Sequence, residues 1–257
     1  MHLFRRTLMV AVLAVFGLGS MRIGWGANPA FIESDKTEVQ STAALIKLGV
    51  PTHKDSEGFV RWIEAASGEF SDEALRYLPG LSKLEWLEIG GGKVTSSGLE
   101  SLKSCTSLKR LYIHDLELGG DSLEWLANLT QLEALSLQRT KIDGRFLKNL
   151  KAKETLAVLN LSGNPIVNND LEQVAGLKQL EVLALADTKV TGDGIRKLEG
   201  MTRLNELNLM HCPVLDDDVS AFLTMPNLRI VYAEGCNIGD MAVIDMKNRF
   251  PMLAIFR

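Results

Sequence analysis

The chain has 257 residues, with 28 lysines and arginines against 32 aspartates and glutamates, so its formal net charge at pH 7 is −4. This acidic balance argues against nucleic acid or an anionic lipid surface as the main partner. The three cysteines are an odd number, which excludes a disulfide-framework fold.

The first element in chain order is a targeting segment. Arg5 and Arg6 precede an uncharged apolar run over residues 7–19 that is short for a membrane span, and small residues follow near Ala27. The layout predicts a signal peptide over residues 1–27 and export to the periplasm, the cell surface or the medium. An uncleaved segment would instead anchor the chain in a membrane, and no later segment reaches spanning length. Removing the segment takes away three arginines and no acidic residue. The remaining chain would have 25 basic residues (28 less 3) and 32 acidic residues, a net charge of −7.

Residues 28–56 form the predicted N-terminal cap, a helix followed by a short strand. An amphipathic helix that ends at Gly49 is expected from the spacing of Val39, Ala43, Leu45 and Ile46. A turn over residues 55–58 then leads into the first repeat.

A leucine that recurs every 24 residues dominates the remainder, residues 57–257. Its copies are Leu84, Leu108, Leu132, Leu156, Leu180, Leu204 and Leu228. A strict period of this length indicates stacked units, because one such unit cannot bury its own apolar face. We number each unit from this leucine as position 1.

Each unit is predicted to be a strand, a turn and a short helix. Apolar residues at positions 4 and 6 share one face of a strand, and those at positions 16 and 19 form one stripe of a helix. The pattern extends back to Val60 and forward to Leu253, which gives about eight units and a truncated strand. Polar stretches before the helices are expected to cap them. We interpret residues 216–218, three aspartates, as such a cap, and a calcium site is the alternative, although the ligand spacing of known acidic loops is absent.

The segments LSLQRTKIDGRFLKNL (residues 135–150) and LALADTKVTGDGIRKL (residues 183–198) resemble leucine-rich repeats, and among these the bacterial exported kind whose units read L-x-L-x-x-T-x-V-T-D-x-G-L. The resemblance implies an α/β solenoid, a right-handed β-α superhelix with parallel strands on its concave face and short helices on its convex face. Because this repeat is a scaffold with many partners, the resemblance predicts the fold far better than the function.

Strand residues that do not point into the core, at positions 3, 5, 7 and 8, form what we call the concave face. Near its N-terminal end the expected partner-binding residues, named here the N-terminal cluster, are Trp62, Trp86, Arg110, Tyr112, His114 and Arg139. Tryptophan, tyrosine and arginine dominate binding hot spots. The alternative is that Trp62 and Trp86 cover the end of the stack or pack under the cap.

A second candidate cluster, near the C-terminal end of the concave face, consists of Met210, His211 and Tyr232, together with Glu234. The alternative for this cluster is a mixed solvated edge. The small apolar side chains between the two clusters suit a protein or peptide better than a charged metabolite.

The sequence predicts neither an enzyme nor a metal or cofactor site. His114 and His211 lie four units apart, about 19 Å at about 4.8 Å per strand, and so cannot share a metal. Ser136 lies one strand from His114, but His114 and Asp115, as adjacent strand residues, are expected to point apart.

Cys212 and Cys236 occupy position 9 of adjacent units, where a disulfide could form after export. Two buried thiols in the turns are the other interpretation. The sequence does not indicate an oligomeric state.

Taken together, these features predict an exported, non-catalytic scaffold whose concave face binds another protein or a peptide. Two alternatives stay open. The stack could be an envelope structural or surface assembly protein without a dedicated ligand, or it could regulate or inhibit an enzyme.

Overall fold

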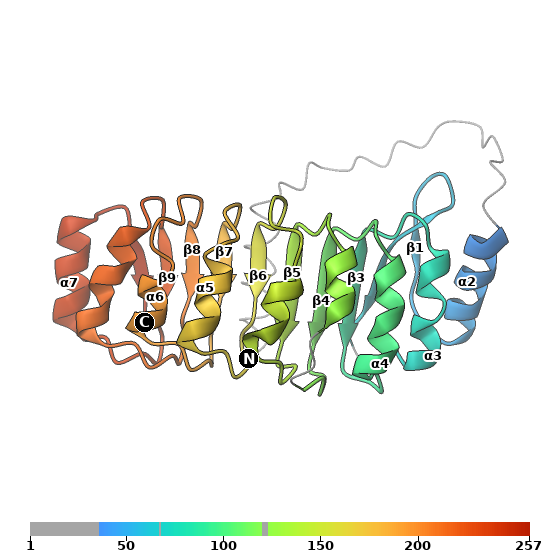
Figure 1. The fold of residues 1–257 in the computed structure, drawn as a ribbon, viewed down its shortest axis with the longest axis horizontal. Coiled ribbons are helices and arrows are strands. Elements are labelled where there is room, and N and C mark those ends of the chain that lie inside the picture. Colours follow the sequence, from blue (N-terminus) through green and yellow to red (C-terminus); the bar gives the residue numbers. More distant parts are fainter. Residues whose placement is uncertain (1–35, 67, 120–122) are drawn as a thin grey trace. The chain divides into compact units, whose positions relative to one another are not determined.

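The computed structural model describes residues 36–66, 68–119 and 123–257; the predicted signal peptide and the start of the predicted cap lie outside them. Helix α2 (Lys36–Lys47) comes first, and ten described strands follow side by side in chain order (Figure 1). Strand β1 is antiparallel to β2, and each later pair of neighbours is parallel. The strands are β1 (His53–Lys54), β2 (Val60–Ala65), β3 (Trp86–Gly90), β4 (Arg110–His114), β5 (Ala134–Gln138), β6 (Val158–Asn160), β7 (Val182–Ala184), β8 (Glu206–Asn208), β9 (Ile230–Tyr232) and β10 (Ala254–Phe256).

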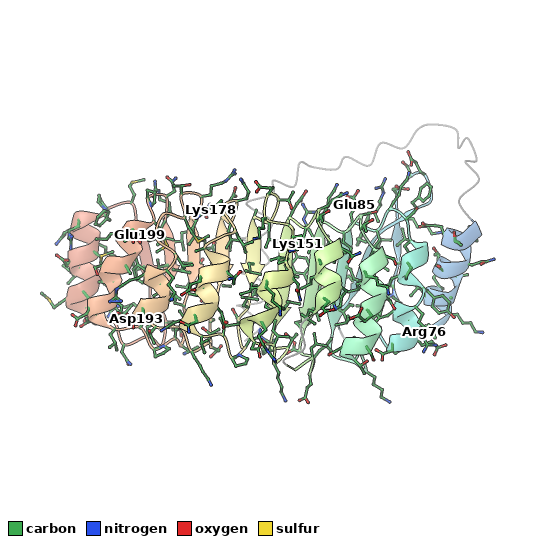
Figure 2. All side chains as sticks on the ribbon, in the orientation of Figure 1. Arg76, Glu85, Lys151, Lys178, Asp193 and Glu199 are labelled. Carbon is green, nitrogen blue, oxygen red and sulfur yellow. The ribbon has the colours of Figure 1, made fainter. Side chains whose placement is uncertain are left out.

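Parallel neighbours require a crossover between strands, and in each unit a short helical segment supplies it, on one side of the sheet (Figure 1). The α-helical segments are α3 (Asp72–Leu75), α4 (Ser96–Leu99), α5 (Leu171–Val174), α6 (Gly192–Arg196) and α7 (Asp240–Arg249). The 3₁₀ segments are η1 (Leu78–Gly80), η2 (Glu100–Ser104), η3 (Glu124–Asn128), η4 (Gly144–Asn149), η5 (Asn168–Asp170) and η6 (Asp216–Thr224). Charged side chains such as Arg76, Lys151 and Lys178 stand out along this side and its loops (Figure 2).

The core lies between the strands and these segments, as the 24-residue period predicts. Leu132, Leu135 and Leu137 of one unit are fully buried, and so is Leu150 at position 19. The expected helix is an α-helix in only some units and a 3₁₀ segment in others. A 3₁₀ segment rises about 2.0 Å per residue against about 1.5 Å for an α-helix, so it covers the same length with fewer residues.

Helix α2 turns a different face to the stack from the one predicted. Leu45 is buried as expected, but Val39 and Ile46 are 50% and 60% exposed. The buried side includes Glu38, whose carboxylate accepts hydrogen bonds from the amides of Val60 (2.9 Å) and Ser82 (3.0 Å). Apolar spacing was misleading here because free amides at the start of the stack need acceptors, and the helix orients to supply one.

Side chains at position 9 form a buried polar row along the turns that follow the strands. The hydroxyls of Thr140 and Thr188 donate to the carbonyls of Leu137 (2.8 Å) and Leu185 (2.7 Å). Asn164, between them, bonds to the preceding turn through the Thr140 amide (3.0 Å) and the Leu137 carbonyl (2.6 Å), and to its own turn through the Leu161 carbonyl (3.0 Å). The row begins at Thr140, because Gly92 and Leu116 occupy position 9 in the two preceding units, and from there it links neighbouring units.

Two of the three aspartates of residues 216–218 bind backbone amides, which confirms the capping interpretation for Asp216 and Asp218. Asp218 accepts from the amide of Leu215 (3.1 Å) at the start of η6, and Asp216 accepts from the amide of Gly239 (2.6 Å) in the next unit. These carboxylates therefore satisfy the free donors of two adjacent turns.

Candidate binding face

Four residues of the N-terminal cluster lie in register on neighbouring strands. Trp62 of β2 pairs with Trp86 of β3, and Trp86 pairs with Arg110 of β4. Two residues further along the strands, Glu88 pairs with Tyr112. Because alternate strand residues point to opposite faces, all five side chains lie on the concave face, opposite the leucines of the core.

Aromatic contacts order the rings of this cluster. The Trp62 ring stacks on His53 of β1, with 4.9 Å between ring centroids and 6° between planes, and the residue is still 36% exposed. Trp86 contacts the Tyr112 ring at 5.9 Å, tilted by 57°. The cap thus covers one side of Trp62, while Trp86 and Tyr112 support each other.

Tyr112 and Arg110 have different electrostatic surroundings. Burial raises the pKa of the Tyr112 hydroxyl to about 12, so the hydroxyl is protonated and can donate a hydrogen bond at neutral pH. The Arg110 guanidinium lies 3.7 Å from the Glu133 carboxylate. The cluster therefore offers one neutral hydroxyl donor and one partly neutralised cation.

The other two residues of the N-terminal cluster, His114 and Arg139, belong to a four-residue chain of contacts at the ends of β3 to β5. His114 Nε2 lies 3.2 Å from Glu88 Oε1, and His114 Nδ1 lies 2.8 Å from Asp115 Oδ2. The Arg139 guanidinium donates to both Asp115 oxygens, at 2.5 and 2.8 Å. Sequence reasoning did not assign Glu88 and Asp115 to the site, although both lie next to residues it named.

The expectation that His114 and Asp115 point apart was wrong. Asp115 has φ of +58°, and this left-handed conformation turns its carboxylate back toward the imidazole. Carboxylates hold both ring nitrogens of His114, which leaves neither to accept a proton from Ser136.

The left-handed conformation recurs at position 8 throughout the stack. The amides at this position donate to a carbonyl of the next unit, as Arg139 does to Ser162 (2.9 Å) and Asp187 does to Met210 (2.8 Å). Where the residue is not glycine, its side chain can lie over the same position of the next unit. The Arg139 side chain does so: its Cγ is so close to Gly163 that a Cβ added to this glycine would lie 2.5 Å from it. The positive-φ residues in this row are Gly91, Asp115, Arg139, Gly163, Asp187, His211 and Gly235.

Comparison with solved structures identifies this architecture. Internalin C2 from Listeria monocytogenes is similar over 86% of this chain and 92% of its own, with 22% identity and a TM-score of 0.57. A chain of the mouse RP105/MD-1 complex matches 62% of this chain with 27% identity and a TM-score of 0.51, and a chain of the TLR13–ssRNA13 complex matches 69% with 23% identity and a TM-score of 0.54.

The chain is a leucine-rich repeat solenoid. It covers 27% and 26% of the RP105/MD-1 and TLR13 chains. No family model and no curated protein matches its sequence. Within the described part of the solenoid, no helix is both long enough and apolar enough to cross a bilayer.

The second predicted cluster lies at the C-terminal end of the solenoid. Tyr232 of β9 stacks on Phe256 of β10, with ring centroids 5.3 Å apart and planes at 22°. The His211 side chain lies over Gly235. Met210 follows β8, and its backbone amide donates to the Asn208 side chain (3.0 Å). Phe256 was missed, although it occupies position 5 of the truncated last unit, the position that Tyr232 holds one unit earlier.

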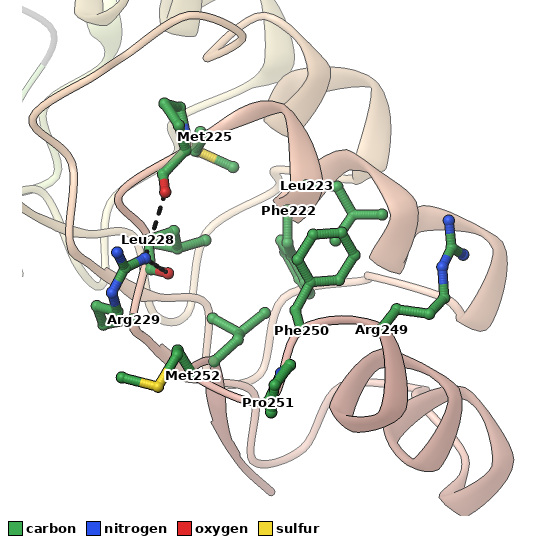
Figure 3. A pocket seen from close by; sticks show the side chains of 11 residues that line it. Phe222, Leu223, Met225, Leu228, Arg229, Arg249, Phe250, Pro251 and Met252 are labelled. Carbon is green, nitrogen blue, oxygen red and sulfur yellow. Dashed lines mark hydrogen bonds between the residues drawn. The ribbon is translucent and has the colours of Figure 1, made fainter.

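A cavity of about 260 Å³ lies between the end of η6 and the residues after α7 (Figure 3). Phe222, Met225 and Phe250 contribute to its mostly apolar lining. The Arg229 guanidinium is bonded to the carbonyls of Pro226 (3.3 Å) and Leu228 (3.0 Å), at its rim. Small-molecule sites are usually larger and contain convergent polar groups, so the concave face remains the stronger candidate.

Cys212 and Cys236 are free thiols in this structure and belong to the position 9 row. Their sulfurs donate to the carbonyls of Leu185 (3.0 Å) and Leu209 (3.1 Å). Burial raises the pKa of the Cys236 thiol to about 11, and it also raises the pKa of Cys212. A disulfide between them stays a prediction for the exported protein.

These thiols are expected to react slowly in the folded solenoid. With its pKa near 11, Cys236 should be alkylated by iodoacetamide at pH 8 at least about 100-fold more slowly than in urea-unfolded protein, because the thiolate is the nucleophile. Mass spectrometry of timed samples measures both rates. Equal rates would contradict the buried environment, and a linked Cys212–Cys236 peptide from unreduced protein would establish the disulfide instead.

The His114 contacts predict a pH dependence. The hydrogen bond to Glu88 raises the pKa of His114, so protonated His114 stabilises the fold below its ordinary pKa of about 6.5 and this contribution is lost as the pH rises through the higher folded value. NMR titration of the imidazole should show a pKa that falls in Glu88→Gln. The loss of unfolding free energy in that variant should be greater at pH 5.5 than at pH 8.5. A pKa that does not change on substitution would refute the contact.

Proposed function

We propose that this leucine-rich repeat solenoid is an exported, non-catalytic scaffold that binds another protein through its concave face, with the N-terminal cluster as the anchor. The observation that carries this proposal is the register of Trp62, Trp86 and Arg110, with the Tyr112 ring against Trp86. A tryptophan side chain that stays exposed on a strand contributes little to the stability of the fold, whereas tryptophan, tyrosine and arginine dominate protein interfaces.

The charge of the chain supports a protein partner, whereas the comparisons do not decide between protein and RNA. One similar chain comes from a complex named RP105/MD-1 and another from a complex with single-stranded RNA, so the fold accommodates both classes of ligand. Here the net charge is −4, and −7 without the three arginines of residues 1–27 (25 basic against 32 acidic). Phosphate backbones require excess positive charge, which favours a protein over nucleic acid.

The export proposal rests on residues 1–27. We propose that this segment is cleaved as a signal peptide, that residues 28–56 cap the solenoid, and that the repeats over residues 57–257 act in the periplasm, at the cell surface or in the medium. An uncleaved segment would give the same scaffold with a membrane anchor. Fractionation of the producing cells, followed by N-terminal sequencing of the protein, tests both versions.

A second candidate function, a structural or assembly element, is favoured by one observation. Met241, Met252 and Phe256 are strongly exposed near the C-terminal end of the stack. Exposed apolar side chains of this size can mark an assembly contact. A regulator or inhibitor of an enzyme would use the concave face in the same way as the first proposal.

Affinity capture from an envelope extract separates these functions. The double variant Trp86→Ala/Tyr112→Ala should lose the captured partner, because it removes the ring pair at the centre of the cluster. The matched control, Met241→Ala/Met252→Ala, removes exposed side chains from the other end and should retain it. Loss of capture only in the control would favour the assembly function, and unchanged capture in both would refute the role of the N-terminal cluster.

A further inference from the structure

Two carboxylates face each other beside the tryptophans of the N-terminal cluster. Glu64 of β2 and Glu88 of β3 are in register on the concave face, two residues beyond Trp62 and Trp86 on the same strands. Neighbouring strands lie about 4.8 Å apart, and like charges directly opposite each other on adjacent strands are destabilising. The fold therefore carries an unfavourable acidic pair directly beside the exposed Trp62 and the half-buried Trp86.

The solenoid neutralises this pair only in part. Glu64 is exposed and forms no hydrogen bond or ion pair within residues 36–66, 68–119 and 123–257. Glu88 contacts only one side of His114, whose other ring nitrogen is taken by Asp115. Neighbouring basic side chains are already committed to other acids, in the pairs Arg61–Asp55, Arg61–Glu85, Lys83–Glu57, Lys109–Glu85, Arg110–Glu133 and Arg139–Asp115.

The adjacent tryptophans supply the complementary half of a cation site. Trp62 and Trp86 are in register and lie one alternation, about 7 Å, from the carboxylates along the strand. Lysine and arginine combine an apolar stem with a charged head, and they interact favourably with tryptophan faces. A stem lying along the rings would place its head at the acidic pair.

We propose that Trp62, Trp86, Glu64 and Glu88 form a recognition site for one lysine or arginine side chain of the partner protein. The inference rests on the proposed function and names the chemistry of its partner: a basic residue on an otherwise largely apolar segment. The incoming cation relieves the repulsion between Glu64 and Glu88, and the rings hold its stem. An acidic segment is excluded from this end of the face by the same carboxylates.

A titration with defined peptides tests the site without the natural partner. The probes are acetyl-Gly-Arg-Gly-amide, its lysine analogue and its citrulline analogue, which keeps the shape of arginine but has no charge. The readout is the indole N–H signals of the protein, purified as its cell makes it and labelled with ¹⁵N. Trp125, which is fully buried, is the internal reference.

The arginine and lysine peptides should shift the Trp62 and Trp86 signals saturably and leave Trp125 unchanged. Citrulline should bind at least about tenfold more weakly, and Glu64→Gln should weaken arginine binding at least about threefold. Because Glu64→Gln removes a repulsive pair, its thermal midpoint should equal or exceed that of the wild type. Equal binding of arginine and citrulline, or undiminished binding by Glu64→Gln, would overturn the inference.

The capture experiment separates the two proposals. If Glu64→Gln retains the natural partner while Trp86→Ala/Tyr112→Ala loses it, the cation site is wrong and the proposed function stands. If both variants retain the partner, both proposals fail. If both lose it and the peptides also discriminate by charge, both are supported.

Discussion

Asn164→Ala is expected to lower the free energy of unfolding by about 3–5 kcal/mol, which urea denaturation followed by circular dichroism will measure. The buried Asn164 carboxamide accepts from the amides of Thr140 (3.0 Å) and Ile142 (3.3 Å), and it donates to the carbonyls of Leu137 (2.6 Å) and Leu161 (3.0 Å). The Leu137 carbonyl keeps the Thr140 hydroxyl as a donor (2.8 Å), but alanine removes the Asn164 partner of the two amides and of the Leu161 carbonyl, and each orphaned buried group costs about 1–3 kcal/mol.

Thr188→Val is the matched control in the same row. Valine keeps the shape of threonine and removes the hydrogen bond to the Leu185 carbonyl (2.7 Å), so the expected loss is about 1 kcal/mol. Both residues are buried in the turns after their strands. An Asn164→Ala variant no less stable than Thr188→Val would show that the stack does not depend on side chains that bridge adjacent turns.

The second prediction concerns affinity. Trp86→Ala is expected to raise the Kd for the captured partner at least about 30-fold, equivalent to about 2 kcal/mol, because the side chain lies at the centre of the N-terminal cluster on the concave face. The Trp86 indole lies between Trp62 on one neighbouring strand and the Tyr112 ring on the other, so its loss exposes both of these side chains to water. Biolayer interferometry with the purified partner measures the change.

Tyr112→Phe provides the control for that substitution. Phenylalanine preserves the ring contact with Trp86 at 5.9 Å and removes only the hydroxyl. We expect a Kd within about threefold of the wild type, because ring area rather than the hydroxyl supports the cluster. If Tyr112→Phe lost as much affinity as Trp86→Ala, the Tyr112 hydroxyl rather than the aromatic rings would be the main contact with the partner.

The recurring leucine made most of the fold predictable. Once position 1 is fixed, alternation places Trp62, Trp86 and Arg110 on one face, and the observed strand register agrees. The buried row at position 9 could also be anticipated, since Thr140 and Asn164 recur where a turn needs polar partners. The core leucines repeat in every unit from Leu84 to Leu228, and the polar residue at position 9 repeats from Thr140 onward, so each copy supports the same register.

Two features could not be read from apolar spacing. The orientation of α2 depends on Glu38 reaching the amides of Val60 and Ser82, which are distant in sequence. The contact between His114 and Asp115 depends on the left-handed backbone at position 8. Glycine at three of the seven positive-φ copies, Gly91, Gly163 and Gly235, was the available signal, because glycine adopts this conformation without strain.

Hydroxyl-radical footprinting of the solenoid, alone and with its captured partner, will show whether the partner binds the concave face. Oxidation of Trp62, Trp86 and Tyr112 should fall at least about threefold in the complex, because a hot spot is shielded from water. Met241 and Met252, both strongly exposed, should oxidise at the same rate in both samples. Protection of the two methionines with unchanged oxidation of Trp62, Trp86 and Tyr112 would contradict binding through the concave face.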